Sequence, residues 1–172
     1  MRIWRIFVGV LMTLALATAC ATKVAEPWHD FAFDGWRDKW HPAHELLEYS
    51  YGDGSRMLRN SIFTPRSPVF EGTSSLPPST GVSGPMPVGD FLFVKWRIKS
   101  TGEVVEDRVD LRQRLPKDMT DHGLTFVIEG NQLYVYVITP KVRNSDLPPN
   151  KKTSSSRYRE TFEIYPTNEL SR

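Results

Sequence analysis

Four histidines are the side chains of this sequence best suited to bind a metal ion. His41 and His44 lie three residues apart, a spacing that places two side chains on one face of a helix, and Glu45 follows directly. Zinc accepts imidazole and carboxylate ligands, so these three residues could begin a zinc site. Pro42 lies between the two histidines and disfavours the helix that such a site needs. We therefore predict no metal site and interpret the histidines as surface or core-edge residues.

The hydroxyl and carboxylate side chains form no pattern typical of an enzyme. A hydrolase needs a nucleophile, a base and an orienting group. The sequence contains neither a Gly-x-Ser-x-Gly motif nor a phosphate-binding Gly-x-x-x-x-Gly-Lys-Ser/Thr loop. Acids such as Asp118 and Asp121 could be paired as in glycosidases, but their spacing along the chain does not fix their separation in space. We predict no catalytic residue, no cofactor and no small-molecule substrate, and expect a function in binding.

The single cysteine, Cys20, follows a segment typical of bacterial secretion signals. Two arginines precede an apolar run at 6–16, and small residues occupy 17–19. In lipoprotein signals a cysteine in this position becomes the lipidated first residue of the mature protein. We therefore predict that residues 1–19 are a cleaved signal peptide and that Cys20 carries lipid.

Two alternatives to lipidation stay open. Ala17 occupies the position where lipoprotein signals usually have leucine, so an ordinary signal peptidase could cleave nearby. A retained membrane anchor is the other, but the apolar run is shorter than the roughly 20 residues that span a membrane. Cleavage by an ordinary signal peptidase would still place the chain in the periplasm.

Loss of the signal peptide changes the charge of the chain. The net charge of +2 comes entirely from Arg2 and Arg5, so the mature chain is neutral. A neutral chain lacks the positive field that attracts nucleic acid. With its one cysteine committed to lipid, the mature chain has no thiol for a disulfide, and we expect packing alone to stabilise a single domain.

Alternating apolar residues predict an antiparallel β fold. The clearest strand spans 90–99, where Leu92, Val94, Trp96 and Ile98 share one face, and a return strand follows over 103–111. Charged residues of the return strand, Glu106, Arg108 and Asp110, could pair with Lys95, Arg97 and Lys99. Asp107 falls on the apolar side, which suggests a strand edge or a bulge. Further strands are predicted at 47–51 with Leu47, Tyr49 and Tyr51 on one face, at 57–63, at 124–129, at 132–139 ending before Pro140, and at 158–165 with Tyr158, Phe162 and Ile164 pointing inward.

The remaining segments connect these strands. Residues 64–89 and 141–156 are rich in Pro, Gly and Ser and are predicted as long loops, the first either functional or disordered. Residues 20–33 are predicted as a lipidated tether, and 34–172 as a single β-rich domain. Seven or so short strands with almost no helix favour an antiparallel β-sandwich.

Two tryptophans precede the first predicted strand. Trp36 and Trp40 are four residues apart, a spacing that would place them on one face of a short helical turn. One interpretation is that they cover one end of the core. The other is that they form an aromatic patch that faces a partner.

Several stretches together resemble a known family. They are Tyr49-Ser50-Tyr51-Gly52-Asp53, 84–96 from Gly84-Pro85-Met86-Pro87 to Val94-Lys95-Trp96, 101–111 from Thr101-Gly102-Glu103 to Val109-Asp110-Leu111, Arg114-Leu115-Pro116 and Gln132-Leu133-Tyr134-Val135-Tyr136. Behind a lipoprotein signal, this set resembles the periplasmic immunity lipoproteins that accompany type VI secretion phospholipase effectors, in particular effectors of the phospholipase D class. The resemblance covers roughly residues 45–140.

The resemblance implies an inhibitor rather than an enzyme. Such a protein binds the effector and blocks its catalytic cleft, and an anchor at Cys20 would hold it in the periplasm, with Ala21 favouring the outer membrane. Because a cleft that handles phosphodiesters is electropositive, the 64–89 loop and the acidic hairpin 103–110 are candidate plugs. Aromatic and arginine side chains usually carry much of the binding energy. The partner-binding candidates are therefore Trp36, Trp40, Arg97, Glu103, Glu106, Asp107 and Asp110.

Two other functions are compatible with the sequence. One is an envelope lipoprotein that acts as a structural or assembly accessory factor. The other is an enzyme, which would require His41, His44 and an acid to line one pocket.

Overall fold

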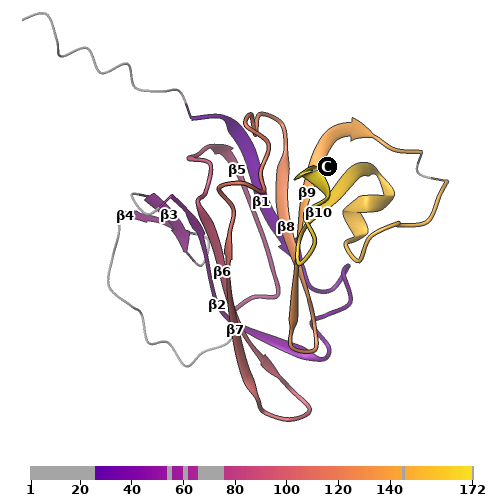
Figure 1. Cartoon of the computed structure of the whole chain (residues 1–172). Coiled ribbons are helices and arrows are strands. Elements are labelled where there is room, and N and C mark those ends of the chain that lie inside the picture. The colour runs from indigo at the N-terminus through magenta and orange to yellow at the C-terminus, as the bar shows by residue number, and fades with distance from the viewer. Residues whose placement is uncertain (1–25, 54–55, 60–61, 66–75, 145, 172) are drawn as a thin grey trace, which may run out of the picture.

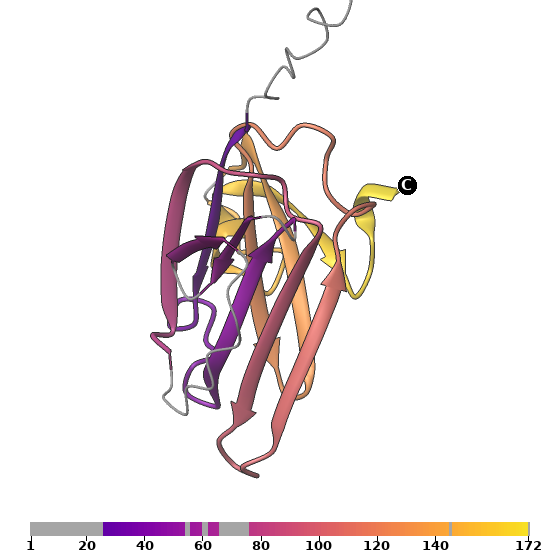
Figure 2. The ribbon, with the colours of Figure 1, turned by 90° about the vertical axis from the view of Figure 1, so that its left-hand side faces the viewer.

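A computed structural model shows two five-stranded sheets packed face to face (Figures 1 and 2). It describes residues 26–53, 56–59, 62–65, 76–144 and 146–171; the predicted signal peptide and Cys20 lie outside these ranges. One sheet has the order β10-β9-β8-β1-β5 and the other the order β4-β3-β2-β6-β7. The elements are β1 Trp28–Asp34, β2 His44–Gly52, β3 Arg56–Arg59, β4 Ile62–Pro65, β5 Ser79–Pro85, β6 Phe91–Ile98, β7 Val104–Asp110, β8 Gly123–Glu129, β9 Gln132–Val142, β10 Arg159–Tyr165 and the short 3-10 helices η1 Ser154–Arg157 and η2 Glu169–Ser171.

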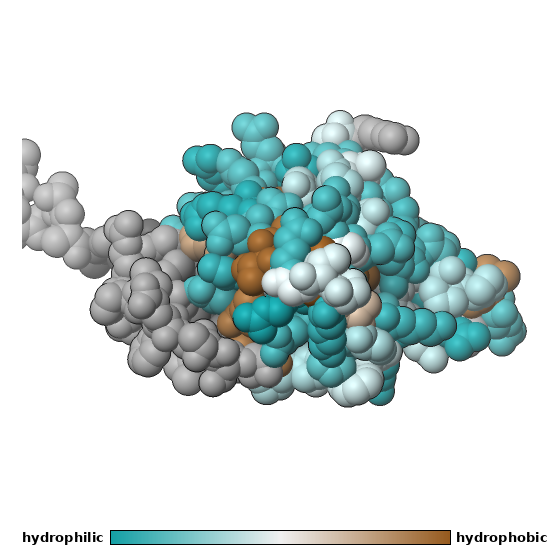
Figure 3. Space-filling view, turned by 90° about the horizontal axis from the view of Figure 1, so that it is seen from below, coloured by the Kyte–Doolittle hydropathy of each residue, from teal (hydrophilic) through white to brown (hydrophobic). Residues whose placement is uncertain are grey.

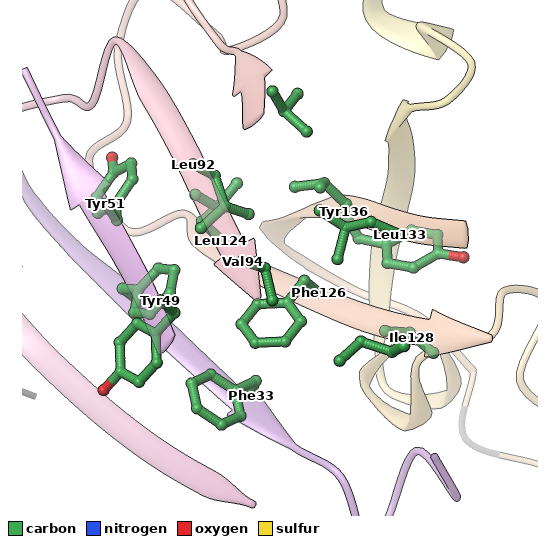
Figure 4. Packing of buried hydrophobic residues seen from close by; sticks show 14 of the residues in the cluster. Phe33, Tyr49, Tyr51, Leu92, Val94, Leu124, Phe126, Ile128, Leu133 and Tyr136 are labelled. Atoms are coloured by element: carbon green, nitrogen blue, oxygen red, sulfur yellow. The ribbon is translucent and has the colours of Figure 1, made fainter. Parts of the chain in front are cut away.

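The core lies between the two sheets and confirms the predicted β-sandwich-like architecture. Figure 4 shows side chains from β1, β2, β6, β8 and β9 meeting in this space. Phe33 and Phe126 have ring centroids 4.5 Å apart, and Phe33 also meets Tyr49 edge to face at 5.0 Å. These contacts join strands of opposite sheets. In the part of the chain that the structure describes, no helix is long and apolar enough to cross a membrane.

The hairpin of β6 and β7 forms as the alternation predicts. Leu92, Val94 and Trp96 are fully buried, and the strands pair without a register shift. Of the predicted charge pairs, Lys95 and Glu106 lie directly opposite each other, with their charged atoms 3.4 Å apart. The alternation of apolar and polar residues predicted this hairpin because one face of it packs on the core and the other is exposed to solvent.

The predicted hairpin of 124–129 and 132–139 is also present, as β8 and β9. The prediction that Pro140 ends the second strand was wrong, since β9 continues to Val142. A register shift between Arg159 and Thr161 on β10 accommodates the proline, because proline is tolerated in a sheet at irregularities of the pairing. On β10 itself Ile164 is buried as expected, whereas Tyr158 precedes the strand and is 55% exposed.

A bulge changes the inward-facing set of β2. Leu46 pairs with Trp96 and Glu48 pairs with Lys95, so Leu47 is an extra residue with no opposite partner on β6. The bulge shifts the alternation by one residue, and Leu46 is buried in place of the predicted Leu47. Tyr49 and Tyr51 keep their predicted inward positions.

The segment predicted as the end of the tether is the first strand of the fold. β1 spans residues 28–34, pairs antiparallel with β5 and parallel with β8, and buries Phe31 and Phe33. The apolar face of this strand is short and begins directly after Pro27, which made it look like a linker. The domain therefore begins before residue 34.

The predicted 64–89 loop also contains regular structure. Residues 79–85 form β5, which pairs with β1 over its full length, and residues 62–65 form β4. Residues 66–75 lie outside the described part of the chain. β5 was not predicted because its sequence, rich in glycine and proline, has too few apolar side chains to show an alternation between a buried and an exposed face.

The polar segment that precedes β10 forms a partial third layer, which we call the strap (residues 143–158). Thr153 and Ser156 of the strap are buried. Tyr136, on the outer face of β9, is fully buried although it points away from the core. Asp38 fastens the strap, since its carboxylate accepts hydrogen bonds from the Ser154 backbone N–H at 2.7 Å and the Thr153 hydroxyl at 3.4 Å.

A buried histidine ties β1 to the opposite sheet. The ring of His29, which is fully buried, lies 3.1 Å by Nδ1 from the Pro27 carbonyl and 3.0 Å by Nε2 from the Tyr51 hydroxyl. The Gly89 backbone N–H donates to the same hydroxyl at 2.9 Å. Both ring nitrogens of His29 are hydrogen bonded when the ring is neutral, with Nδ1–H donating to the Pro27 carbonyl and Nε2 accepting from the Tyr51 hydroxyl. Burial lowers the pKa of His29 below its usual 6.5, and burial raises the pKa of Tyr51 to about 12.

This network predicts that the protein is less stable in mild acid. Because the folded-state pKa of His29 is lowered, the unfolded chain binds a proton first as the pH falls below 6.5. Stability is therefore complete above pH 6.5 and decreases as the pH falls toward the folded-state pKa, with a slope of up to about 1.4 kcal/mol per pH unit. Urea unfolding between pH 7.5 and 5 measures this slope.

The matched variant is His29→Gln, whose amide keeps a donor and an acceptor without titrating. We expect this variant to flatten the pH dependence between pH 6.5 and 5. An unchanged slope in the variant would assign the effect to other groups.

Candidate protein-binding surface

The connection from β1 to β2 is a rigid loop without regular structure. The Asp34 carboxylate accepts hydrogen bonds from the backbone N–H groups of Trp36 and Arg37, both at 3.0 Å. The Gly35 N–H donates to the Pro78 carbonyl at 2.7 Å, and its carbonyl accepts from the His41 N–H at 3.0 Å. These bonds fix the loop before any partner arrives.

The two tryptophans of this loop point in opposite directions. Trp40 is 2% exposed and packs on Phe33 and Phe126, whereas Trp36 is 62% exposed. Residues 35–39 form turns rather than a helix, and Lys39 adopts a left-handed backbone with φ of 63°, which reverses the side-chain direction between the tryptophans. Trp40 is thus a core residue, as one of the two interpretations of the pair expected, and it offers almost no surface to a partner.

Trp36 is supported by its neighbours. Its indole meets the His41 ring edge to face with centroids 4.3 Å apart. The His41 carbonyl accepts a hydrogen bond from Lys99 Nζ at 2.8 Å. Partial burial, and secondarily the Lys99 ammonium, lower the pKa of His41, so its ring is neutral at neutral pH.

The tip of the β6–β7 hairpin lies beside this loop. The Lys99 N–H donates to the Ala43 carbonyl at 2.9 Å, which joins the hairpin to the loop. Gly102, with φ of 75°, makes the turn, and Val104, two residues later, is 46% exposed. Figure 1 shows the hairpin extending beyond the other strands, and Figure 3 shows this end of the molecule with a small hydrophobic area surrounded by hydrophilic residues.

We call this end the distal surface. Its members come from the loop and the hairpin tip, and they are Trp36, Arg37, Lys39, His41, Lys99, Glu103 and Val104.

The charge of the distal surface is more positive than the sequence suggested. Asp38 turns inward to the strap, and burial raises the pKa of its carboxyl group. Asp34 is occupied by the loop backbone and lies 3.5 Å from Arg37. Lys39 and Lys99 are exposed, and Glu103 is the acid that the hairpin tip adds. The distal surface therefore combines an aromatic side chain with a small excess of cations.

The other predicted candidates from the hairpin serve the fold of the sheet. Arg97 makes an ion pair with Glu45 on the neighbouring strand, and Glu106 pairs with Lys95. Both pairs lie on the outer face of the sheet. Pairs of this kind stabilise cross-strand packing and leave fewer free charges for a partner.

The last two acids lie away from the distal surface. Asp107 points toward the core side as the alternation indicated, and its carboxylate is hydrogen bonded to Tyr165 on β10 of the opposite sheet. Asp110 is at the other end of β7, where hydrogen bonds from Arg112 lower its pKa to about 2. The predicted acidic plug at 103–110 is therefore divided, with only Glu103 at the hairpin tip.

The histidines do not form the site that an enzyme or a metal would need. His44 is buried, and its Nδ1 lies 2.9 Å from the Trp40 carbonyl, while His41 faces Trp36 at the surface. Among the residues that the structure describes, no group of three or more His, Cys, Asp and Glu is placed to hold a metal ion.

Sequence reasoning missed the cations of the distal surface. Arg37 and Lys39 flank Trp36 and Trp40 in Gly35-Trp36-Arg37-Asp38-Lys39-Trp40, and that alternation of aromatic and basic residues was the available signal. The contact of Lys99 with the loop was also missed, because Lys99 and the loop residues Ala43 and His41 are far apart in the sequence.

The comparisons with known proteins give no relative. No protein-family model, no curated protein sequence and no solved structure matches the chain.

Proposed function

We propose that this chain is an exported, lipid-anchored immunity protein that binds and inhibits a type VI secretion phospholipase effector. The observation that carries a binding role is the exposed Trp36 on a loop fixed by its own hydrogen bonds. Exposed tryptophans that are held rigid lose little conformational entropy on binding and are common centres of interface energy. The phospholipase partner and the lipid anchor are supported by the motifs of the resemblance and by the lipoprotein-like leader that ends at Cys20.

The position of the distal surface suits a protein anchored at its N-terminus. β1 begins eight residues after Cys20, so the start of the strand lies within about 28 Å of the proposed lipid. The strand runs from this end to Asp34, which begins the loop of the distal surface. The loop that carries Trp36 therefore lies at the end of β1 opposite the proposed anchor (Figure 1 shows the course of the strand), and in this proposal it faces away from the membrane.

The charges favour a covering mode of inhibition rather than an acidic plug. Trp36 would bind an apolar recess at the rim of the effector's cleft, and Arg37, Lys39 and Lys99 would face carboxylates around it. Val104 of the hairpin would add apolar contact area. In this mode the inhibitor excludes the lipid substrate without donating a group to the effector's catalytic residues.

Contact between sibling bacteria tests the proposal. Cells that lack this chain are expected to be killed by wild-type siblings, and the wild-type chain supplied in trans is expected to protect them. The purified chain is expected to form a one-to-one complex with the effector encoded beside it and to stop its phospholipase activity. Survival of the deletion strain, with impaired secretion or a weakened envelope instead, would favour the accessory-factor alternative.

A further inference from the structure

A second exposed surface lies at the opposite end of the sandwich from Trp36. Asp30, Gly123 and Ile138 form one row across β1, β8 and β9. β1 starts two residues before this row, and β9 continues four residues past it to Val142. Arg159 of β10 pairs with Val142. The start of the domain and the β9–β10 junction are therefore at the same end, as Figure 1 shows.

The β9–β10 junction combines exposed hydrophobic and basic side chains. Val142 is 73% exposed and Tyr158 is 55% exposed, the largest and fourth largest exposures among the large hydrophobic side chains of the described residues. We call this surface the basic corner, and its members are Lys141, Val142, Arg157, Tyr158 and Arg159.

The backbone of the basic corner is well fixed. The Arg143 N–H donates to the Tyr158 carbonyl at 2.9 Å, and the Arg143 guanidinium donates to the carbonyls of Pro148 and Ser156 at 2.9 and 2.6 Å. Val142 and Tyr158 are therefore held outward by a closed hydrogen-bonded structure, and the solvent-facing position of both side chains is built into the fold.

The charge of the basic corner is positive. Lys141, Arg157 and Arg159 are exposed, and Glu160 offsets one of these charges through an ion pair with Lys141 at 2.9 Å. On the β1 side of the same end, Asp30 and Asp121 are exposed near Trp28. The positive charge is therefore confined to the β9–β10 side.

We infer that the basic corner rests on the anionic phospholipid surface to which the chain is anchored. The inference uses the lipid anchor of the proposed function and adds the orientation of the domain. Anionic headgroups attract clustered Lys and Arg side chains, and tyrosine prefers the boundary between headgroups and hydrocarbon. An anchor near the start of β1 keeps this corner close to the membrane. Contact there holds the domain upright and directs Trp36 into the periplasm.

Fluorescent labels at the two ends test this orientation. Acylation occupies the single cysteine, so Asn144→Cys beside the basic corner and Ser100→Cys at the hairpin tip each supply one free thiol for a polarity-sensitive dye. The lipidated protein is reconstituted in vesicles of phosphatidylglycerol and phosphatidylethanolamine, and quenching by neutral acrylamide is measured. We expect the label at 144 to be quenched at least threefold less than the label at 100.

Charge variants show whether the headgroups cause the protection. Lys141→Glu with Arg159→Glu is expected to remove the protection at 144, whereas the matched distal pair Arg37→Glu with Lys39→Glu is expected to keep it. Vesicles of phosphatidylcholine alone are expected to protect weakly. Equal quenching at 144 and 100, equal protection on phosphatidylcholine, or loss of protection in the distal pair would each overturn the inference.

Different results would contradict the lipid anchor and the proposed orientation of the domain. A chain that does not float with the vesicles, and whose mass shows no acyl groups, contradicts the anchor. Adding from solution a chain that carries Cys20→Ser with the labelled Asn144→Cys then tests the corner directly, and we expect protection that depends on phosphatidylglycerol. Absence of that protection would overturn the inference for either form of the chain.

Discussion

Replacing Gly89 by alanine is expected to lower the free energy of unfolding by about 3 kcal/mol or more. A Cβ atom at this position would lie 2.2 Å from the ring of Tyr51, far inside van der Waals contact. The ring cannot move aside easily. It is 1% exposed, stacks on Phe31 with centroids 5.2 Å apart, and holds His29 by its hydroxyl. The substitution therefore creates a steric clash, and moving the ring to relieve it would break the buried hydrogen bond from the backbone N–H of residue 89 to the Tyr51 hydroxyl.

Gly81→Ala is the matched control for this prediction. A Cβ atom at Gly81, on the exposed strand β5, would meet nothing within 4 Å. Alanine there is expected to be neutral or slightly stabilising, because it restricts the unfolded chain. Urea unfolding of the two variants at pH 7.5 measures the difference. Similar stability in both would show that the Tyr51 ring has more freedom than its contacts indicate.

Replacing Trp36 by alanine is expected to weaken the complex with the effector by about 30-fold to several hundred-fold. This follows from the proposed function, since Trp36 is the large exposed side chain at the centre of the distal surface. The change is expected to leave the free energy of unfolding within about 0.5 kcal/mol, as for other surface substitutions. Titration calorimetry with the purified effector gives the affinity, and urea unfolding gives the stability.

Trp40→Ala separates binding from folding. Trp40 is buried against Phe33 and Phe126, and its removal is expected to destabilise the fold by about 3–5 kcal/mol. Trp36→Ala should therefore change mainly the affinity for the effector, and Trp40→Ala mainly the free energy of unfolding. A Trp36→Ala variant that binds the effector as tightly as the wild type would exclude the distal surface as the centre of the interface.

The sequence was most informative for strands that have one solvent-exposed face and one buried face. The alternation of Leu92, Val94 and Trp96 located β6 and its face correctly, and the strands predicted at 124–129 and 132–139 located the β8–β9 hairpin. β2 was found with the wrong inward leucine because a bulge adds Leu47, and a bulge depends on the partner strand. β1 was missed even though His29, Phe31 and Phe33 alternate, since a short pattern after a proline also fits a linker.

The candidate surface was harder to predict because it depends on turn geometry. A spacing of four residues places Trp36 and Trp40 together on a helix, but one left-handed residue, Lys39, separates them into solvent and core. The acids of the hairpin were correctly placed on β7, yet the partners of Asp107 and Asp110 come from other elements. Residue type predicts which side chains can bind, and only the fold decides which of them are available.

The place of β1 in its sheet has a consequence for biogenesis. Although it is made first, β1 lies between β5 and β8, and Asp30 finds its parallel neighbour only when Gly123 has been synthesised. Such non-local pairing slows spontaneous folding. The emerging polypeptide would stay extended long enough to be threaded through a translocation pore. In the proposed exported chain, folding would then finish on the far side, beside the bilayer to which the proposed lipid anchor attaches.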